Sequence, residues 1–451
     1  MSRGLFASGD FDISLPSRFW KGAFLLALGI HGLLLAYSTM RISLSATLAD
    51  SMSVADLREA LRLDRMNPEA HRRLGLVYPY SYSFDNLERG EAVRQLRRAV
   101  ELRPRNAWYW AELASACEDA GDRACADNAV ERALSLSPMA PRLHWLAANY
   151  YLRTDRTDVA LSQFRRLLEL SPQYSQSTFR VCLRVAPDPW VVYEKVLSPT
   201  NAPQLALAYV NYLGQQGHLD DAYRIWGRIS TGPFRVDFAQ AQPFLENLIA
   251  QGRVQDARSV WEDLLRLGVV RRSSGGDQTN ALFNGSFESN LLNGGFDWRL
   301  NPSPYVAVDF PDRSAYQGAR CLQVSFSVSR NEEFEPLYQL VPVVPGESYL
   351  LTAFVRSDNV TSDSGPRLRV VDAYHPERIV AVTEVTRGTS GWHPVHTEFL
   401  VGPQTQLVRV SVWRARSRSF PSEISGTFWM DAVTLKPVTL PMTNNPQERR
   451  H

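Results

Sequence analysis

The hydrophobic pattern of the chain begins with one long apolar run near the N-terminus. Residues 22–40 contain no charged side chain, and Arg41 closes the run. A helix of this length rises about 28 Å, close to the thickness of the hydrocarbon core of a bilayer. The pattern therefore predicts a transmembrane helix over 22–40, preceded by a tail over 1–21.

The charges beside this run predict its orientation. Arg3, Arg18 and Lys21 precede it, and only Arg41 follows it closely. The positive-inside rule then places the N-terminus in the cytoplasm and the rest of the chain outside it. A cleavable signal peptide is the alternative, because small residues surround Ala46–Ala49, but the run is longer than a signal peptide needs. We expect a retained anchor in a bacterial inner membrane, with the bulk of the chain in the periplasm.

The next 220 residues have the apolar spacing of paired helices, with a fixed period. Pro104, Pro138 and Pro172 are each 34 residues apart, and small residues such as Ala114, Ala126 and Ala133 recur within the period. Periods of about 20–50 residues are typical of solenoids. Alanines allow two antiparallel helices to pack closely, and each proline ends the second helix of a pair.

These positions resemble the tetratricopeptide repeat over residues 50–270. The resemblance implies an all-α solenoid that binds a protein partner in its groove. Two departures are visible. The first unit lacks a clear first helix, and prolines within 175–203 make regular stacking there doubtful. Cys117 and Cys125 flank the turn at Gly121, where they either form a disulfide or remain buried thiols.

The pattern changes after residues 271–279, which are predicted to be a linker rich in serine and glycine. From 280 to 437, short segments alternate apolar and polar residues between turns, as in RLRVVDAY and LVRVSVW. This pattern predicts an antiparallel all-β sandwich of the jelly-roll type, followed by a flexible tail over 438–451.

The two ends of this segment resemble the galactose-binding-like fold, and among its members carbohydrate-binding modules. The resemblance rests on NALFNGSFE at 280–288, Trp298, and FWMDAVTL at 428–435. It implies glycan binding, and it also implies a structural calcium ion near Glu288 and Asp431, whose carboxylates suit calcium. Alternatively, these two carboxylates cap turns or pair with arginine.

The glycan-binding candidates are aromatic and arginine side chains. In LVRVSVW, alternation turns Val408, Val410 and Val412 inward and leaves Arg409 and Trp413 on the other face. The predicted glycan-contacting residues are Trp413, Arg409, Arg414, Arg416, Trp298 and Tyr338. The alternative is that Trp413 covers a second sheet and the arginines edge a loop. The acidic stretch Glu332–Glu335 is expected to be a solvated loop.

Composition narrows the classes of function. The chain has 451 residues and a net charge of +2, and only three of its 49 basic side chains are lysines. Basic and acidic residues number 29 and 27 over 50–272, and 14 and 16 over 280–440, so neither part has the basic surface of a nucleic-acid-binding protein. The arginine excess is typical of a GC-rich bacterial genome; the alternative is selection for planar, bidentate recognition of anions.

No sequence motif for catalysis is present. Neither a nucleophile elbow, nor a phosphate-binding loop, nor a His-Glu-x-x-His zinc motif occurs. We therefore predict a non-enzymatic membrane-anchored scaffold that binds a protein partner and a polysaccharide or oligosaccharide, in assembly or export of a surface polysaccharide. A purely structural scaffold without glycan binding is the alternative, and a glycan-cleaving enzyme is the third reading.

Overall fold

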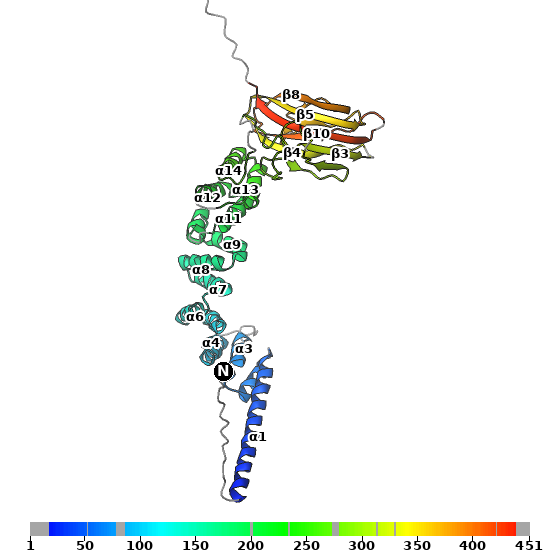
Figure 1. Cartoon of the computed structure of the whole chain (residues 1–451). Helices are drawn as coiled ribbons and strands as arrows, with labels where there is room; N and C mark the ends of the chain where they lie inside the picture. Colours follow the sequence, from blue (N-terminus) through cyan, green and yellow to red (C-terminus); the bar gives the residue numbers. More distant parts are fainter. Residues whose placement is uncertain are drawn as a thin grey trace, which may run out of the picture. The chain divides into compact units, whose positions relative to one another are not determined.

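The computed structural model describes most of the chain, shown in Figure 1. The described residues are 18–51, 53–77, 86–198, 202–232, 235–272, 279–312, 314–328, 331–420 and 422–438. Most of the predicted N-terminal tail, most of the linker and almost all of the C-terminal tail lie outside them.

Fourteen α-helices precede the strands in this described part. Eight belong to a first compact unit, Met1–Tyr174, and six to a second, Ser175–His451. In the first unit the helices are α1 (Arg18–Ala49), α2 (Val54–Leu63), α3 (Pro68–Val77), α4 (Asn86–Leu102), α5 (Ala107–Asp119), α6 (Arg123–Leu136), α7 (Pro141–Arg153) and α8 (Thr157–Leu170), with the short η2 (Pro172–Tyr174). In the second they are α9 (Ser175–Val185), α10 (Pro189–Val192), α11 (Pro203–Gln215), α12 (Leu219–Thr231), α13 (Phe238–Ala250) and α14 (Val254–Arg266), with η3 (Tyr193–Leu197) after α10.

Helix α1 is long and apolar enough to cross a membrane, and it is the one such helix among the described residues. It does not end where the apolar run ends. It continues to Ala49, and its last turns pack on α2, where Ser45 and Ala49 are buried. The hydroxyl of Ser45 donates to the carbonyl of Ala60 at 2.8 Å. The expectation that the first repeat lacks its first helix was therefore wrong, because the last turns of α1 supply it.

The period seen in the sequence corresponds to helical pairs. Pro104, Pro138 and Pro172 all fall between the second helix of one pair and the first helix of the next. The alanines at the pair contacts are almost completely buried, as the close approach of two helices requires. Gly121 has a φ of +77°, a conformation that glycine adopts without a Cβ penalty. The thiols of Cys117 and Cys125 are joined in a disulfide across this turn.

The second unit contains two further helical pairs, α11 with α12 and α13 with α14. Trp226 on α12 and Trp261 on α14 occupy equivalent positions, and both are buried. The indole N–H of Trp226 donates to Asp263 at 2.9 Å, which joins the two helical pairs. The proline-rich stretch is helical but broken, with a π-helical turn in η3 following α10.

Two five-stranded antiparallel sheets form the C-terminal sandwich. The first, called sheet A here, has the strand order β1-β4-β9-β6-β7, and the second, sheet B, has the order β2-β3-β10-β5-β8. The strands are β1 (Arg299–Leu300), β2 (Val306–Asp309), β3 (Leu322–Val328), β4 (Phe334–Pro342), β5 (Ser348–Val360), β6 (Arg367–Asp372), β7 (Val380–Val382), β8 (Gly388–Leu400), β9 (Leu407–Arg414) and β10 (Ile424–Pro437). The predicted fold class, an apolar helix, an all-α solenoid and an all-β sandwich, is confirmed.

The last helices contact the sandwich within the second unit. The ring of Trp261 lies 5.2 Å from Phe283 and 5.8 Å from Phe296, both from the opening segment of the sandwich. Glu246 on α13 forms an ion pair with Arg299 at 2.9 Å. Gly295 packs against Trp261 so closely that a Cβ would lie 2.5 Å from the indole. The sandwich is therefore fitted onto the final helical pair, not only joined to it by the linker.

Candidate functional site

The outer face of sheet A carries the main cluster of predicted site residues. On β9 the inward side chains Val408, Val410 and Val412 are buried, while Arg409 and Trp413 lie on the outer face and are partly exposed. Tyr338 lies on the same face of the neighbouring strand β4, where it pairs in register with Ser411. Alternation along the two strands thus brings Trp413, Arg409 and Tyr338 together.

Trp413 is held on this face by polar contacts and by arginines. Its indole N–H donates to Glu333 at 2.7 Å. The guanidinium carbon of Arg369 lies 4.5 Å from the centre of its ring, and that of Arg367 lies 5.4 Å from it. These are cation–π distances, so two cations compete with any other group for the ring surface.

Glu335 connects the two aromatic residues through arginines. It pairs with Arg369 at 3.1 Å and with Arg409 at 3.2 Å. The guanidinium of Arg409 lies 4.2 Å from the ring centre of Tyr338. A continuous layer of alternating charges and rings therefore crosses β4, β9 and β6. We call it the arginine–aromatic layer, and its members are Glu333, Glu335, Tyr338, Arg367, Arg369, Arg409 and Trp413.

The layer is positively charged and has unused hydrogen-bond donors. The layer contains three arginines and two glutamates. Burial lowers the pKa of Arg367, and the positive charge of nearby Arg387 lowers it further. The Nε atoms of Arg367, Arg369 and Arg409 are buried and have no hydrogen-bond partner within the described residues. Unpaired buried donors are costly, so these three arginines are incompletely satisfied by the described residues.

Four members of the layer were not anticipated from sequence: Glu333, Glu335, Arg367 and Arg369. Arg367 and Arg369 alternate with buried Leu368 and Val370 on β6, so the period-two pattern already contained the signal. Glu335 was expected in a solvated loop, but it lies within β4 and its side chain is 13% exposed. Burial beside two arginines makes it a structural element of the layer.

Two predicted glycan contacts are wrong. Arg414 is completely buried, because alternation along β9 turns it to the same inner face as Val408, Val410 and Val412. Its guanidinium donates to the carbonyls of Glu332, Ser364 and Ser422. Trp298 is also completely buried, with its ring 5.3 Å from that of Phe287. Neither side chain offers a surface to a ligand.

Arg416 lies beyond the end of β9 and is exposed. It forms a long ion pair with Glu332 at 3.7 Å, and its side chain is 68% exposed. It is therefore at the rim of the arginine–aromatic layer, available to a ligand but not fixed in place.

Glu288 and Asp431, the predicted calcium ligands, face the same loop. Glu288 accepts hydrogen bonds from the backbone N–H groups of Ala319 and Arg320, and Asp431 accepts them from Tyr316 and Gln317. Burial raises the pKa of Asp431, and the charge of Glu288 adds to this effect. Within the described residues no three acidic, histidine or cysteine side chains converge as a metal site. The carboxylates accept these N–H groups, whereas a calcium ion takes six to eight oxygen ligands, so the structural calcium stays a prediction.

The calcium prediction has a direct test. If an ion binds Glu288 and Asp431, 1 mM calcium chloride raises the unfolding midpoint of the sandwich by several degrees over EGTA, because binding to the native state alone stabilises it. Glu288→Gln should remove that increase. Equal midpoints in calcium and EGTA would contradict the prediction, and calorimetry on the purified chain measures them.

Asp297 is a second buried carboxylate, and it predicts a pH dependence of stability. Burial raises its pKa to about 6, although the N–H groups of Leu292 and Trp298 donate to it. The Asp297 carboxyl thus holds its proton more tightly in the folded state than in the unfolded state. Its contribution to the free energy of unfolding is therefore complete below about pH 4 and is lost as the pH rises through about 6.

For this reason we expect the sandwich to be destabilised relative to Asp297→Asn as the pH rises from 4 to 7. Because the pKa of Asp297 is raised by about 2, the difference in free energy of unfolding between the two proteins should change by about 3 kcal/mol over this pH range. Urea unfolding of both proteins at about pH 3.5 and about pH 7.5 measures it. A difference that is independent of pH would show that Asp297 has an ordinary pKa.

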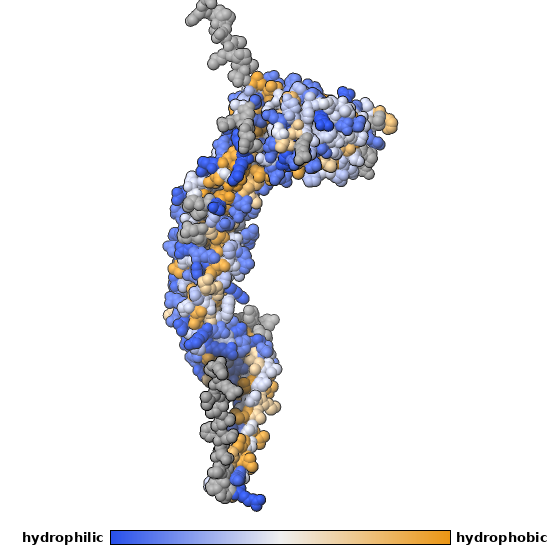
Figure 2. Space-filling model, viewed as in Figure 1, coloured by the Kyte–Doolittle hydropathy of each residue, from blue (hydrophilic) through white to orange (hydrophobic). Residues whose placement is uncertain are grey.

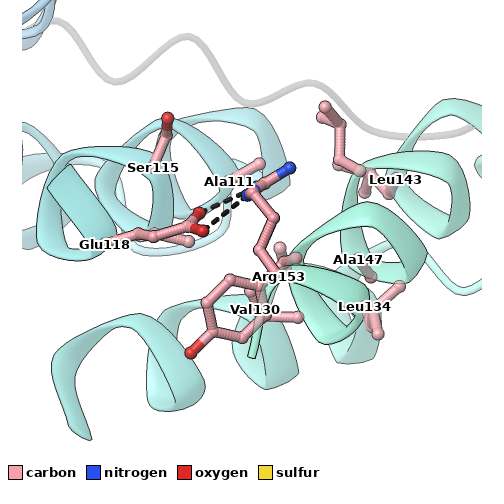
Figure 3. Close-up of a pocket in the computed structure, with 12 residues that line it drawn as sticks. Ala111, Ser115, Glu118, Val130, Leu134, Leu143, Ala147 and Arg153 are labelled. Carbon is pink, nitrogen blue, oxygen red and sulfur yellow. Dashed lines mark hydrogen bonds and ion pairs between the residues drawn. The ribbon is translucent and has the colours of Figure 1, made fainter. Parts of the chain in front are cut away.

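The solenoid of the first unit contains a separate small cavity, shown in Figure 3. It has a volume of about 70 Å³ and lies between α5, α6 and α7. Apolar side chains, among them Val130, Leu134 and Leu143, line it. At its edge Arg153 reaches Glu118 from the neighbouring pair and forms two hydrogen bonds, of 2.6 and 2.8 Å. The cavity therefore lies between consecutive helical pairs, beside this ion pair.

Comparison with known proteins gives a family match for part of the solenoid. Residues 113–175 match the family model described as tetratricopeptide repeat. No curated protein matches the chain in sequence. Among solved structures, the chain is similar to a MamA structure from Desulfovibrio magneticus RS-1, with 22% identity, a TM-score of 0.25, and coverage of 30% of this chain and 75% of that one.

The sandwich has its own structural neighbours. A structure titled "CBM4 structure and function" shares 13% identity, covers 35% of this chain and 99% of its own, and has a TM-score of 0.27. A CBM61 module in complex with β-1,4-galactotriose shares 19% identity, covers 35% of this chain and 99% of its own, and has a TM-score of 0.24.

Together with the helical pairs described above, the family match identifies residues 113–175 as tetratricopeptide repeats.

Proposed function

We propose that this chain is a membrane-anchored scaffold whose solenoid binds a protein partner and whose sandwich binds glycan. The observation that carries the glycan proposal is the arginine–aromatic layer on the outer face of sheet A. It combines two aromatic rings, which suit the apolar face of a sugar, with planar donors for hydroxyl or carboxylate groups. These groups come from three adjacent strands, so the rigid sheet fixes their spacing.

The charge of the layer indicates the kind of glycan. Three arginines outnumber two glutamates, and Arg416 adds a further cation at the rim. A uronic acid carboxylate can form paired hydrogen bonds with a guanidinium, which a neutral sugar cannot do. We therefore propose an acidic polysaccharide as the preferred ligand, and the assembly or export of a bacterial surface polysaccharide as the setting.

The compartment is part of the same proposal. We place the N-terminus in the cytoplasm, α1 in the inner membrane and the solenoid and sandwich in the periplasm. The disulfide between Cys117 and Cys125 supports this placement, because disulfides persist in oxidising compartments. A reporter enzyme fused after His451 should be active only in its periplasmic form, and cytoplasmic activity would overturn the orientation.

The glycan proposal is tested by affinity electrophoresis of the purified protein. Gels containing polygalacturonate or alginate should retard it, and neutral galactan should retard it less. Added salt should weaken the retardation, because exposed charges are screened. Equal mobility in all gels, with and without polysaccharide, would refute glycan binding, whereas release of reducing sugar would indicate an enzyme.

A scaffold without glycan binding is the second candidate, and one observation favours it. Arg369, Arg367 and Arg409 already lie over the rings of Trp413 and Tyr338, which is also how aromatic residues are covered at protein contacts. In that case, the same face should bind an acidic protein surface, and the mobility in polysaccharide gels should remain unchanged.

A further inference from the structure

Helix α2 is hydrogen-bonded to α1 just beyond the end of the apolar run. Helix α2 runs antiparallel to α1, so its C-terminus returns along α1 towards the N-terminal part. Arg41, the residue that closes the apolar run, donates to the carbonyl of Leu63 at 2.6 Å and also contacts that of Arg62. The end of α2 is therefore at the level of Arg41.

The loop between α2 and α3, residues 64–67, is fixed at the same depth. The side-chain amide of Asn67 donates to the hydroxyl of Ser45 at 2.9 Å, and both residues are buried. Ser45 lies four residues beyond Arg41, about 6 Å along the helix axis. When α1 spans a membrane, this loop consequently lies in the headgroup region.

The exposed side chains of this region suit such a position. The side chain of Arg62 is 78% exposed, Met66 is 59% exposed, and Arg65 is exposed between them. Arginine binds lipid phosphate through paired hydrogen bonds, and an unbranched methionine fits among the first methylenes of the acyl chains. Arg62 pairs with Glu59 at 2.9 Å, and Asp64 lies between the two arginines, so residues 62–66 have a net charge of +1. Arginines next to an exposed apolar tip are typical of a membrane-surface contact.

A matched loop occurs further along the same unit. Met139, between α6 and α7, is 65% exposed, and Arg166 contacts its sulfur at 3.3 Å, as Arg98 contacts that of Met66 at 3.5 Å. Figure 1 shows α6 and α7 beyond the end of α1 that packs on α2, away from the apolar half of α1. Of these two described loops, the one carrying Met66 is hydrogen-bonded to α1 near the end of the apolar run.

We propose that residues 62–66 form a lipid-binding surface, in which Arg62 and Arg65 bind the phosphates of anionic lipids and Met66 enters the interface. The inference rests on α1 being the membrane anchor proposed above. It means that the first repeat is seated on the bilayer without a linker, which fixes the direction in which the solenoid leaves the membrane.

The test uses the full chain in nanodiscs that contain phosphatidylglycerol and a phosphatidylcholine with a nitroxide on its headgroup. Met66→Cys and Met139→Cys are each labelled with an environment-sensitive fluorophore. The unsubstituted protein provides the labelling background, because Cys117 and Cys125 are bonded and Cys182 and Cys321 are buried. We expect the nitroxide to quench the fluorophore at position 66 and not the one at position 139.

The role of charge is tested with Arg62→Gln combined with Arg65→Gln, measured at position 66 in the same nanodiscs. Two arginines near an anionic surface are expected to strengthen contact about 30-fold, so quenching should fall in this variant and in high salt. Arg132→Gln, at an exposed position in α6, is the control and should have no effect.

The outcomes separate the two proposals. A chain that fails to co-elute with nanodiscs refutes the membrane anchor itself. A chain that co-elutes, but whose fluorophores at positions 66 and 139 are quenched equally or not at all, refutes the lipid-binding surface alone. Quenching at position 66 that is the same in pure phosphatidylcholine refutes the part assigned to anionic lipid.

Discussion

Arg414→Met should destabilise the sandwich by about 3–5 kcal/mol, the largest effect that we expect from a substitution on β9. The guanidinium of Arg414 is completely buried and donates to three backbone carbonyls from different loops. It also contacts the hydroxyl of Ser362 and lies 5.5 Å from the ring centre of Phe334. Methionine fills similar volume but leaves these carbonyls without a donor, and unsatisfied buried acceptors are costly.

Arg416→Met is the matched control, two residues away. Its side chain is largely exposed and has one long ion pair, so we expect a change within about 0.5 kcal/mol. Calorimetry of both variants, following the transition of the sandwich, measures the two effects. Similar midpoints for the two variants would mean that Arg414 does not anchor these loops.

Trp413→Ala should weaken glycan binding by about 30-fold or more, as the loss of a central aromatic contact does at other interfaces. The indole is the ring that Arg367 and Arg369 flank, and its N–H is fixed by Glu333. Removing it takes away the surface for a sugar and also releases both arginines. Because the side chain is at the outer face, the fold should persist.

Trp429→Ala is the control for this prediction, because it has the same type of environment on sheet B. The guanidinium of Arg356 lies 4.6 Å from its ring centre, and its indole N–H donates to Gln323. We expect Trp429→Ala to bind an acidic oligosaccharide with the same affinity as the unsubstituted protein. Titration calorimetry measures both affinities. Equal losses in both variants would indicate a general effect on the sandwich and not a site at Trp413.

The architecture could be predicted from sequence because it depends on periodicity. Proline spacing locates the helical pairs, and the alternation in β9 correctly separates Val410 and Val412 from Arg409 and Trp413. These signals are local, since each face of a helix or strand must repeat at the period of its backbone. Figure 2 shows apolar residues along the visible face of α1, and the described residues bury none of its apolar window.

The remaining features depend on contacts between distant segments. Glu335 pairs with Arg369 and Arg409 from two other strands, and strand order is not visible in a single sequence. Arg414 shows a different difficulty. A charged side chain is expected at the surface, whereas alternation along β9 places this residue on the inner face of the sheet. The continuation of α1 to Ala49 was missed because the apolar run ends at Met40, while helicity does not require apolar residues.

The most direct test of the central claim, that the arginine–aromatic layer binds an acidic glycan, is fluorine NMR of the chain labelled with 5-fluorotryptophan. Trp413→Phe assigns the resonance of position 413, and an acidic oligosaccharide is then titrated into the protein. We predict that the Trp413 resonance shifts in a saturable manner while that of Trp429 stays in place. A Trp413 resonance that does not move at saturating ligand, or a shift confined to other tryptophans, would contradict the claim.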